Sequence, residues 1–109
     1  MTFNYTFNQI STETVKGCMA MFMPYTWQQK NGGVDLELYY TEDSGTVEAS
    51  SPLAACEKLF TLYNIDPPKG YHGRSMSVSD VVCLWEVTSR NEAPATAWFC
   101  DSIGFQRIA

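Results

Sequence analysis

The sequence predicts an α+β fold, in which an antiparallel β-sheet carries one or two helices packed on one face. Three features predict it: an alternating aromatic segment at residues 3–7, an amphipathic segment at residues 52–63, and several short apolar segments separated by turn residues towards the C-terminus. With 109 residues, 45% of them hydrophobic and 17% charged, the chain can build a core of its own. We therefore expect a single domain over residues 1–109.

The first strand is predicted by Phe3, Tyr5 and Phe7, which alternate with polar residues. A period of two with aromatics on one side is typical of a strand with one buried face. The remainder of residues 1–50 is expected to add a helix and a second strand.

A first helix is predicted to begin with Ser11 as its N-cap and to end before Pro24. Its apolar residues would be Val15, Cys18, Met19 and Phe22. The alternating Met19, Met21 and Met23 leave a second interpretation open, a strand over Cys18–Tyr25. These methionines are expected to fill the core or to form an adaptable binding surface.

Asn31-Gly32-Gly33 predicts a break in regular structure. The segment Val34–Tyr40 then alternates apolar and acidic residues, which predicts a half-exposed strand. Asp43-Ser44-Gly45 predicts the turn after it.

The clearest helix is predicted over Pro52–Tyr63. Ser51 suits the N-cap, and proline suits the first helical position. One apolar stripe, expected to pack on the sheet, contains Leu53, Cys56, Leu59, Phe60 and Tyr63.

The C-terminal part predicts strands joined by turns. After the connector Pro67-Pro68-Lys69-Gly70, we expect a mostly buried strand at about Asp80–Val87. The segments that follow are a hairpin loop at Ser89–Pro94, a strand at Ala95–Cys100, a turn at Asp101–Gly104 and a last strand at Phe105–Ile108.

The formal net charge is −5 and the pI is about 4.6, which disfavours contact with a nucleic-acid backbone. An acidic surface ordinarily keeps a small protein in solution. An alternative is an acidic DNA mimic, although the acids are scattered along the chain. The start of the sequence does not resemble a signal peptide, and its longest apolar stretch is too short for a membrane span, so a cytoplasmic location is expected.

The four cysteines, Cys18, Cys56, Cys83 and Cys100, lack the close spacing of a zinc site. The last three lie among apolar residues, so they are expected to be buried free thiols. We expect no metal and no cofactor.

The candidate binding site is the polar loop that precedes the predicted buried strand. Its candidate residues are Tyr71, His72, Gly73, Arg74, Ser75, Ser77 and Asp80. Asp80 is expected to accept backbone N–H groups in its own turn.

Arg74 is expected to pair with Asp80, Asp101 or Asp66, or to bind a carboxylate or phosphate. His72 is expected at the surface, with a general base as the alternative. A small enzyme or nucleotide-binding protein would need His72, Arg74 and Asp80 together in one pocket. The sequence has no nucleophile elbow, no phosphate-binding loop motif and no dinucleotide-binding motif.

The segments Leu59–Asn64, Pro67-Pro68, Tyr71–Val82 and Trp98–Phe105 resemble the YodL-like domain family. The shared patterns are a helix ending in F-x-x-[FY]-N, a loop P-x-x-[YF]-x-G-R-S-[LM]-S-V-[GS]-D-V-[IV] and a closing [YF]-[YF]-[CV]-D-x-x-G-F. The resemblance covers Leu59–Phe105 and leaves residues 1–50 unplaced.

The resemblance implies a protein of Gram-positive gut-type bacteria, carried on a conjugative element or phage and acting against host defences. It implies no established enzyme activity and no settled catalytic residues. Together with the acidic charge and the 14% aromatic content, it predicts a non-enzymatic module that binds another protein.

Overall fold

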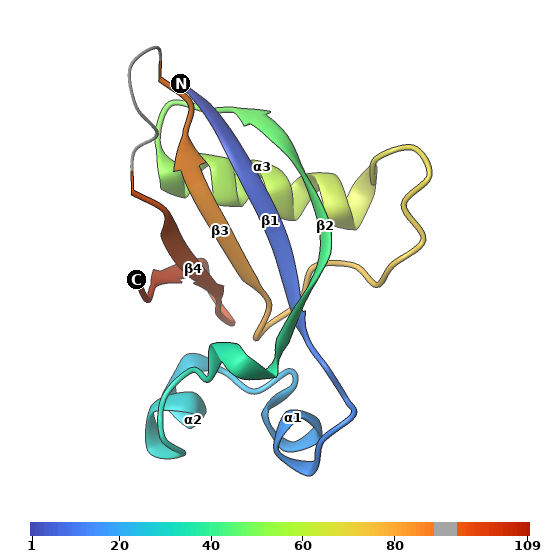
Figure 1. Cartoon of the computed structure of the whole chain (residues 1–109), viewed down its shortest axis with the longest axis vertical. Helices are drawn as coiled ribbons and strands as arrows, with labels where there is room; N and C mark the ends of the chain where they lie inside the picture. The colour runs from blue at the N-terminus through green and yellow to red at the C-terminus, as the bar shows by residue number, and fades with distance from the viewer. Residues whose placement is uncertain (89–93) are drawn as a thin grey trace.

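The computed structural model describes residues 1–88 and 94–109. A five-stranded antiparallel sheet in the order β2-β1-β3-β4-β5 forms its centre, and the helix α3 crosses one face (Figure 1). The strands are β1 Thr2–Ile10, β2 Tyr39–Glu48, β3 Val81–Glu86, β4 Thr96–Cys100 and β5 Phe105–Arg107. The predicted α+β fold is confirmed. Among the described residues, no helix is both long and apolar enough to cross a membrane.

The predicted first strand is confirmed as β1, which lies between β2 and β3. Phe3, Tyr5 and Phe7 are buried against the α3 side of the sheet. Tyr5 is directly opposite Leu84 in β3, and Phe7 is opposite Val82. The period-two pattern therefore fixes which face of β1 enters the core.

The helix α3, Pro52–Ile65, begins as predicted: the Ser51 Oγ accepts a hydrogen bond from the Ala54 N–H at 3.1 Å. Cys56, Leu59 and Tyr63 are buried as expected. Phe60 is 41% exposed but still packs edge-to-face on Phe105 of β5, whereas Leu53, also 41% exposed, was wrongly placed in the buried stripe. The buried stripe is rotated and includes Ala55 instead, because a small residue there lets the helix approach the sheet closely.

The N-terminal helix was predicted with the wrong cap and the wrong end. The helix α1 is Val15–Ala20, and its N-cap is Thr14, whose Oγ1 accepts from the Gly17 N–H at 2.9 Å. The Oγ of Ser11 instead accepts from the Glu13 N–H, one turn earlier. The helix α1 contains Cys18, Met19 and Ala20 and so excludes the strand over Cys18–Tyr25, and the second helix α2, Tyr25–Lys30, was not predicted.

The strand predicted over Val34–Tyr40 was also largely wrong. A 3-10 turn η1, Leu36–Leu38, occupies its centre, and β2 starts only at Tyr39. The predicted turn Asp43-Ser44-Gly45 lies inside β2, where a register shift opposite Phe7 and Asn8 accommodates one extra residue. Pairing with β1 outweighs the local turn preference of these residues.

The C-terminal strands β3, β4 and β5 agree with prediction, and Gly104, with a φ of +71°, forms the turn before β5. Of the predicted loop Ser89–Pro94, residues 89–93 lie outside the described residues. On the sheet face opposite α3, the buried Val81 and Phe99 pack against Tyr25 and Tyr39. This second cluster joins the α1–α2–η1 segment to one end of the sheet (Figure 1).

Candidate functional site

Asp80 stands at the end of the candidate loop and is 0% exposed. Its carboxylate accepts from the Ser77 N–H at 2.8 Å, as predicted, and pairs with the Arg74 guanidinium at 3.0 Å. Gln9 of β1 donates to it from Nε2 at 3.3 Å. Burial raises the pKa of Asp80, and these three donors act in the opposite direction. The carboxylate is therefore saturated by the protein's own groups.

Arg74 turns inward rather than towards solvent. Its guanidinium lies 4.7 Å from the centre of the Phe22 ring, a cation–π contact with a residue of the N-terminal segment. The Arg74 carbonyl accepts a hydrogen bond from the Tyr71 hydroxyl at 2.6 Å. Of the three predicted ion-pair partners of Arg74, Asp80 is the one observed.

Ser79 connects the loop to the same N-terminal segment. Its side chain is fully buried, and its Oγ accepts from the Phe22 N–H at 2.9 Å. The Ser79 carbonyl accepts from the Tyr39 hydroxyl at 2.5 Å. Ser79 and Phe22 have φ values of +84° and +67°, a conformation uncommon outside glycine. Both residues are thus held in strained positions by their contacts.

Asp101, from the closing motif, caps a helix that is distant in sequence. Pro24 at the N-cap of α2 offers no side-chain acceptor, and the Asp101 Oδ1 accepts from the Tyr25 N–H at 3.1 Å instead. The same oxygen accepts from the Ser102 N–H at 2.8 Å. Sequence reasoning missed this role because a cap is ordinarily sought next to the helix it serves.

The side chains of His72, Ser75 and Ser77 do not converge with those of Arg74 and Asp80. His72 and Ser75 are exposed, and Ser77 donates from its Oγ to the Ser75 carbonyl at 3.4 Å. Gly73 lies against the Glu42 carboxylate and the Tyr71 ring, which would have to shift to make room for a Cβ at this position. The pocket holding His72, Arg74 and Asp80 together is not formed.

A buried tyrosine network was not predicted. The hydroxyls of Tyr5 and Tyr63 are 2.8 Å apart, and the Tyr63 hydroxyl donates to the Asp43 Oδ2 at 2.6 Å. Burial raises the pKa of both tyrosines. The alternation of residues in β1 could have shown that Tyr5 is buried, but not which partner its hydroxyl finds.

The described residues contain no group of three or more His, Cys, Asp or Glu side chains placed to hold a metal ion. Cys56 and Cys100 are buried as predicted, and Cys83 is half-buried. Burial raises the pKa of the Cys56 and Cys100 thiols to about 12 in each case. Cys18 is exposed on α1.

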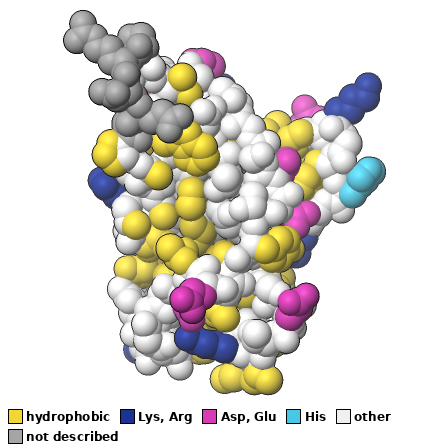
Figure 2. Space-filling model, viewed as in Figure 1, with side chains coloured by type: hydrophobic (Ala, Val, Ile, Leu, Met, Phe, Trp, Pro, Cys, Tyr) yellow, Lys and Arg dark blue, Asp and Glu magenta, His cyan; other side chains and the backbone are white. Residues whose placement is uncertain are grey.

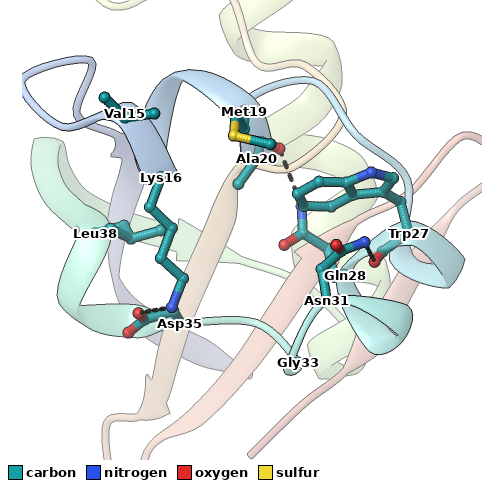
Figure 3. A pocket seen from close by; sticks show the side chains of 10 residues that line it. All are labelled: Val15, Lys16, Met19, Ala20, Trp27, Gln28, Asn31, Gly33, Asp35 and Leu38. Atoms are coloured by element: carbon teal, nitrogen blue, oxygen red, sulfur yellow. Dashed lines mark hydrogen bonds and ion pairs between the residues drawn. The ribbon is translucent and has the colours of Figure 1, made fainter.

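A hollow of about 390 Å³ opens between α1, α2 and η1 (Figure 3). Val15 is 78% exposed and Met19 is 60% exposed, so of the two roles expected for the methionines, filling the core does not apply to Met19. The ion pair between the Lys16 Nζ and the Asp35 Oδ2, 2.7 Å long, joins α1 to the segment before η1. The lining residues are mostly apolar or long-chained: Val15, Lys16, Met19, Ala20, Trp27, Gln28, Asn31, Gly33, Asp35 and Leu38.

The fold and these contacts define a class of α+β domain in which a polar loop and a closing motif fasten an N-terminal helical segment to a five-stranded sheet. The chain belongs to the YodL-like domain family, whose model matches residues 4–109. The match therefore also covers the N-terminal half that the resemblance over Leu59–Phe105 left unplaced. Neither the curated proteins nor the solved structures contain a match to the chain.

Proposed function

We propose that the chain is a non-enzymatic module that binds another protein through the hollow between α1, α2 and η1. The observation that supports it is the exposure of Val15 and Met19 at the mouth of this hollow. Neighbouring exposed apolar side chains are typical of a surface that a partner covers.

The candidate loop supports this proposal because it has a structural role. The Asp80 carboxylate, the Arg74 guanidinium and the Ser79 hydroxyl all contact the protein itself, and two of these residues contact Phe22. Groups committed in this way are poorly placed for substrate chemistry. Their effect is to fix the segment that presents α1 and α2.

The family resemblance supports the wider part of the proposal, an origin on a conjugative element or phage and a host defence protein as the partner. The acidic DNA mimic has weaker support. On the face shown in Figure 2, the Asp and Glu side chains are separated by other side chains and form no continuous acidic surface.

The experiment is affinity capture from a host lysate, quantified by mass spectrometry, with the wild type and with Met19→Glu. We expect at least one protein to be captured by the wild type and lost with Met19→Glu. Ile103→Glu is the matched control, because Ile103 is 94% exposed in the turn before β5 and does not line the hollow. Capture profiles that do not differ between Met19→Glu and Ile103→Glu would contradict the proposal. Circular dichroism spectra of both variants check that they are folded.

A further inference from the structure

The outer edge of β2 is a long strand edge with no strand beside it among the described residues. β2 is ten residues long and lies at one end of the strand order. Each of its residues except Glu42 is in register with β1 on its inner side. The outward-facing N–H and C=O groups of such a strand are a template for one more strand.

A groove runs along this edge. Residues 42–46 of β2 form one wall, and residues 68–73 of the loop after α3 form the other. Tyr5 and Leu62 also line this space, which has a volume of about 870 Å³. In Figure 1 the C-terminal end of α3 projects beyond β2, so a strand added here would also rest on the helix.

The acidic side chains of β2 favour a partner strand that carries positive charge. β2 carries Glu42, Asp43 and Glu48 and has no lysine or arginine. In Figure 2, Asp and Glu side chains lie along the side of the molecule where Figure 1 places β2. Lys69, on the opposite wall, is the one lysine or arginine among the described lining residues.

A second copy of this chain fits the edge poorly. Pairing β2 with another β2 adds the acidic residues of two strands to one edge with no lysine or arginine to offset them, and any register that places like charges opposite each other is destabilising. Acidic residues on an edge strand suppress self-pairing in this way. The same residues favour a strand of opposite charge.

We propose that the β2 edge and its groove bind an extended, lysine- or arginine-bearing segment of another protein as a sixth strand of the sheet. Main-chain hydrogen bonds to β2 would supply affinity, and Glu42 and Glu48 would select for the basic side chains. This site shares no residue with the α1–α2–η1 hollow, so each can fail independently of the other.

The test uses an array of octapeptides in which every second residue is lysine or arginine and the others are Val, Ile, Thr or Tyr. Binding to the whole chain is measured by fluorescence anisotropy. The best binder is then made in two N-methylated forms, one blocking the odd amides and one the even amides. Only one of these sets can face β2 in a strand.

We expect one N-methylated form to lose binding and the other to retain it. Glu42→Gln/Glu48→Gln should weaken binding about fivefold at low salt. The matched control, Glu37→Gln/Glu57→Gln, removes the same charge from exposed positions outside β2 and should change binding less than twofold. Met19→Glu should bind the peptide like the wild type.

Three results of the peptide experiments would overturn the proposal. They are no peptide binding up to about 1 mM, equal binding by both N-methylated forms, and equal weakening by the two double variants. A dimer in sedimentation with β2 amides protected from exchange would assign the edge to a second copy and would overturn it too.

Discussion

The Ser79 Oγ accepts a hydrogen bond from the Phe22 N–H at 2.9 Å, across 57 residues of sequence. It links the loop of the family motif to the turn between α1 and α2. Both residues have positive φ. The loop and the N-terminal segment therefore hold each other in conformations that neither favours alone.

Replacing Ser79 should separate the contribution of its side-chain hydrogen bond from the cost of its positive φ. Ser79→Ala removes the acceptor and should lower the free energy of unfolding by about 1–2 kcal/mol. Ser79→Gly also removes the hydrogen-bond acceptor, but glycine adopts a φ of +84° freely. The free energy of unfolding should therefore fall less in Ser79→Gly than in Ser79→Ala. Urea denaturation measures both variants. A larger loss for glycine than for alanine would show that the backbone at Ser79 is not strained.

The buried ion pair should matter more than the surface pair. Asp80 is 0% exposed and the Arg74 side chain is 31% exposed. Asp80→Asn leaves the Arg74 charge without its partner and should cost about 2–3 kcal/mol. The control Lys16→Gln breaks a pair whose side chains are 61% and 29% exposed, and should cost at most about 1 kcal/mol. If urea denaturation showed the same decrease in unfolding free energy for Asp80→Asn and Lys16→Gln, the structural role of Asp80 would be contradicted.

Alkaline pH should destabilise the fold through its buried tyrosines. Burial raises the pKa of Tyr71 from 10.0 to about 12. The folded state thus keeps a proton that the unfolded chain loses, and this stabilisation is complete below pH 10 and lost as the pH rises towards 12. Tyr71→Phe should reduce the fall in unfolding free energy over this range. An unchanged fall would show that Tyr71 does not contribute to it.

Thiol labelling should distinguish the four cysteines. Cys18 is exposed, whereas Cys56 and Cys100 are buried with a raised pKa. At pH 8 the native chain should therefore label fastest at Cys18 and more slowly at the half-buried Cys83, and Cys18→Ser should remove the fastest phase. All four should react after unfolding. Fast labelling that persists in Cys18→Ser would mean that the core opens readily.

The parts of the fold that follow from local sequence were predictable. α3 has its own cap and apolar periodicity, and Asp80 binds an N–H three residues away. α2 was not predictable in the same way, because Asp101 caps its first N–H and Ser79 holds Phe22, in the turn before it, from a distance in sequence. β2 likewise depends on β1, which draws turn-forming residues into a strand. The candidate loop was located correctly, but its contact with Phe22 has no local signal.

The central claim is that the motif residues fasten the N-terminal helical segment to the sheet. Amide hydrogen exchange of Asp101→Ala tests it most directly, because this change removes the acceptor at the start of α2 and leaves the core untouched. The account predicts about fivefold faster exchange in Tyr25–Lys30, with β1 and β3 amides unchanged. Unchanged exchange in α2, or an equal increase in all strands, would contradict it.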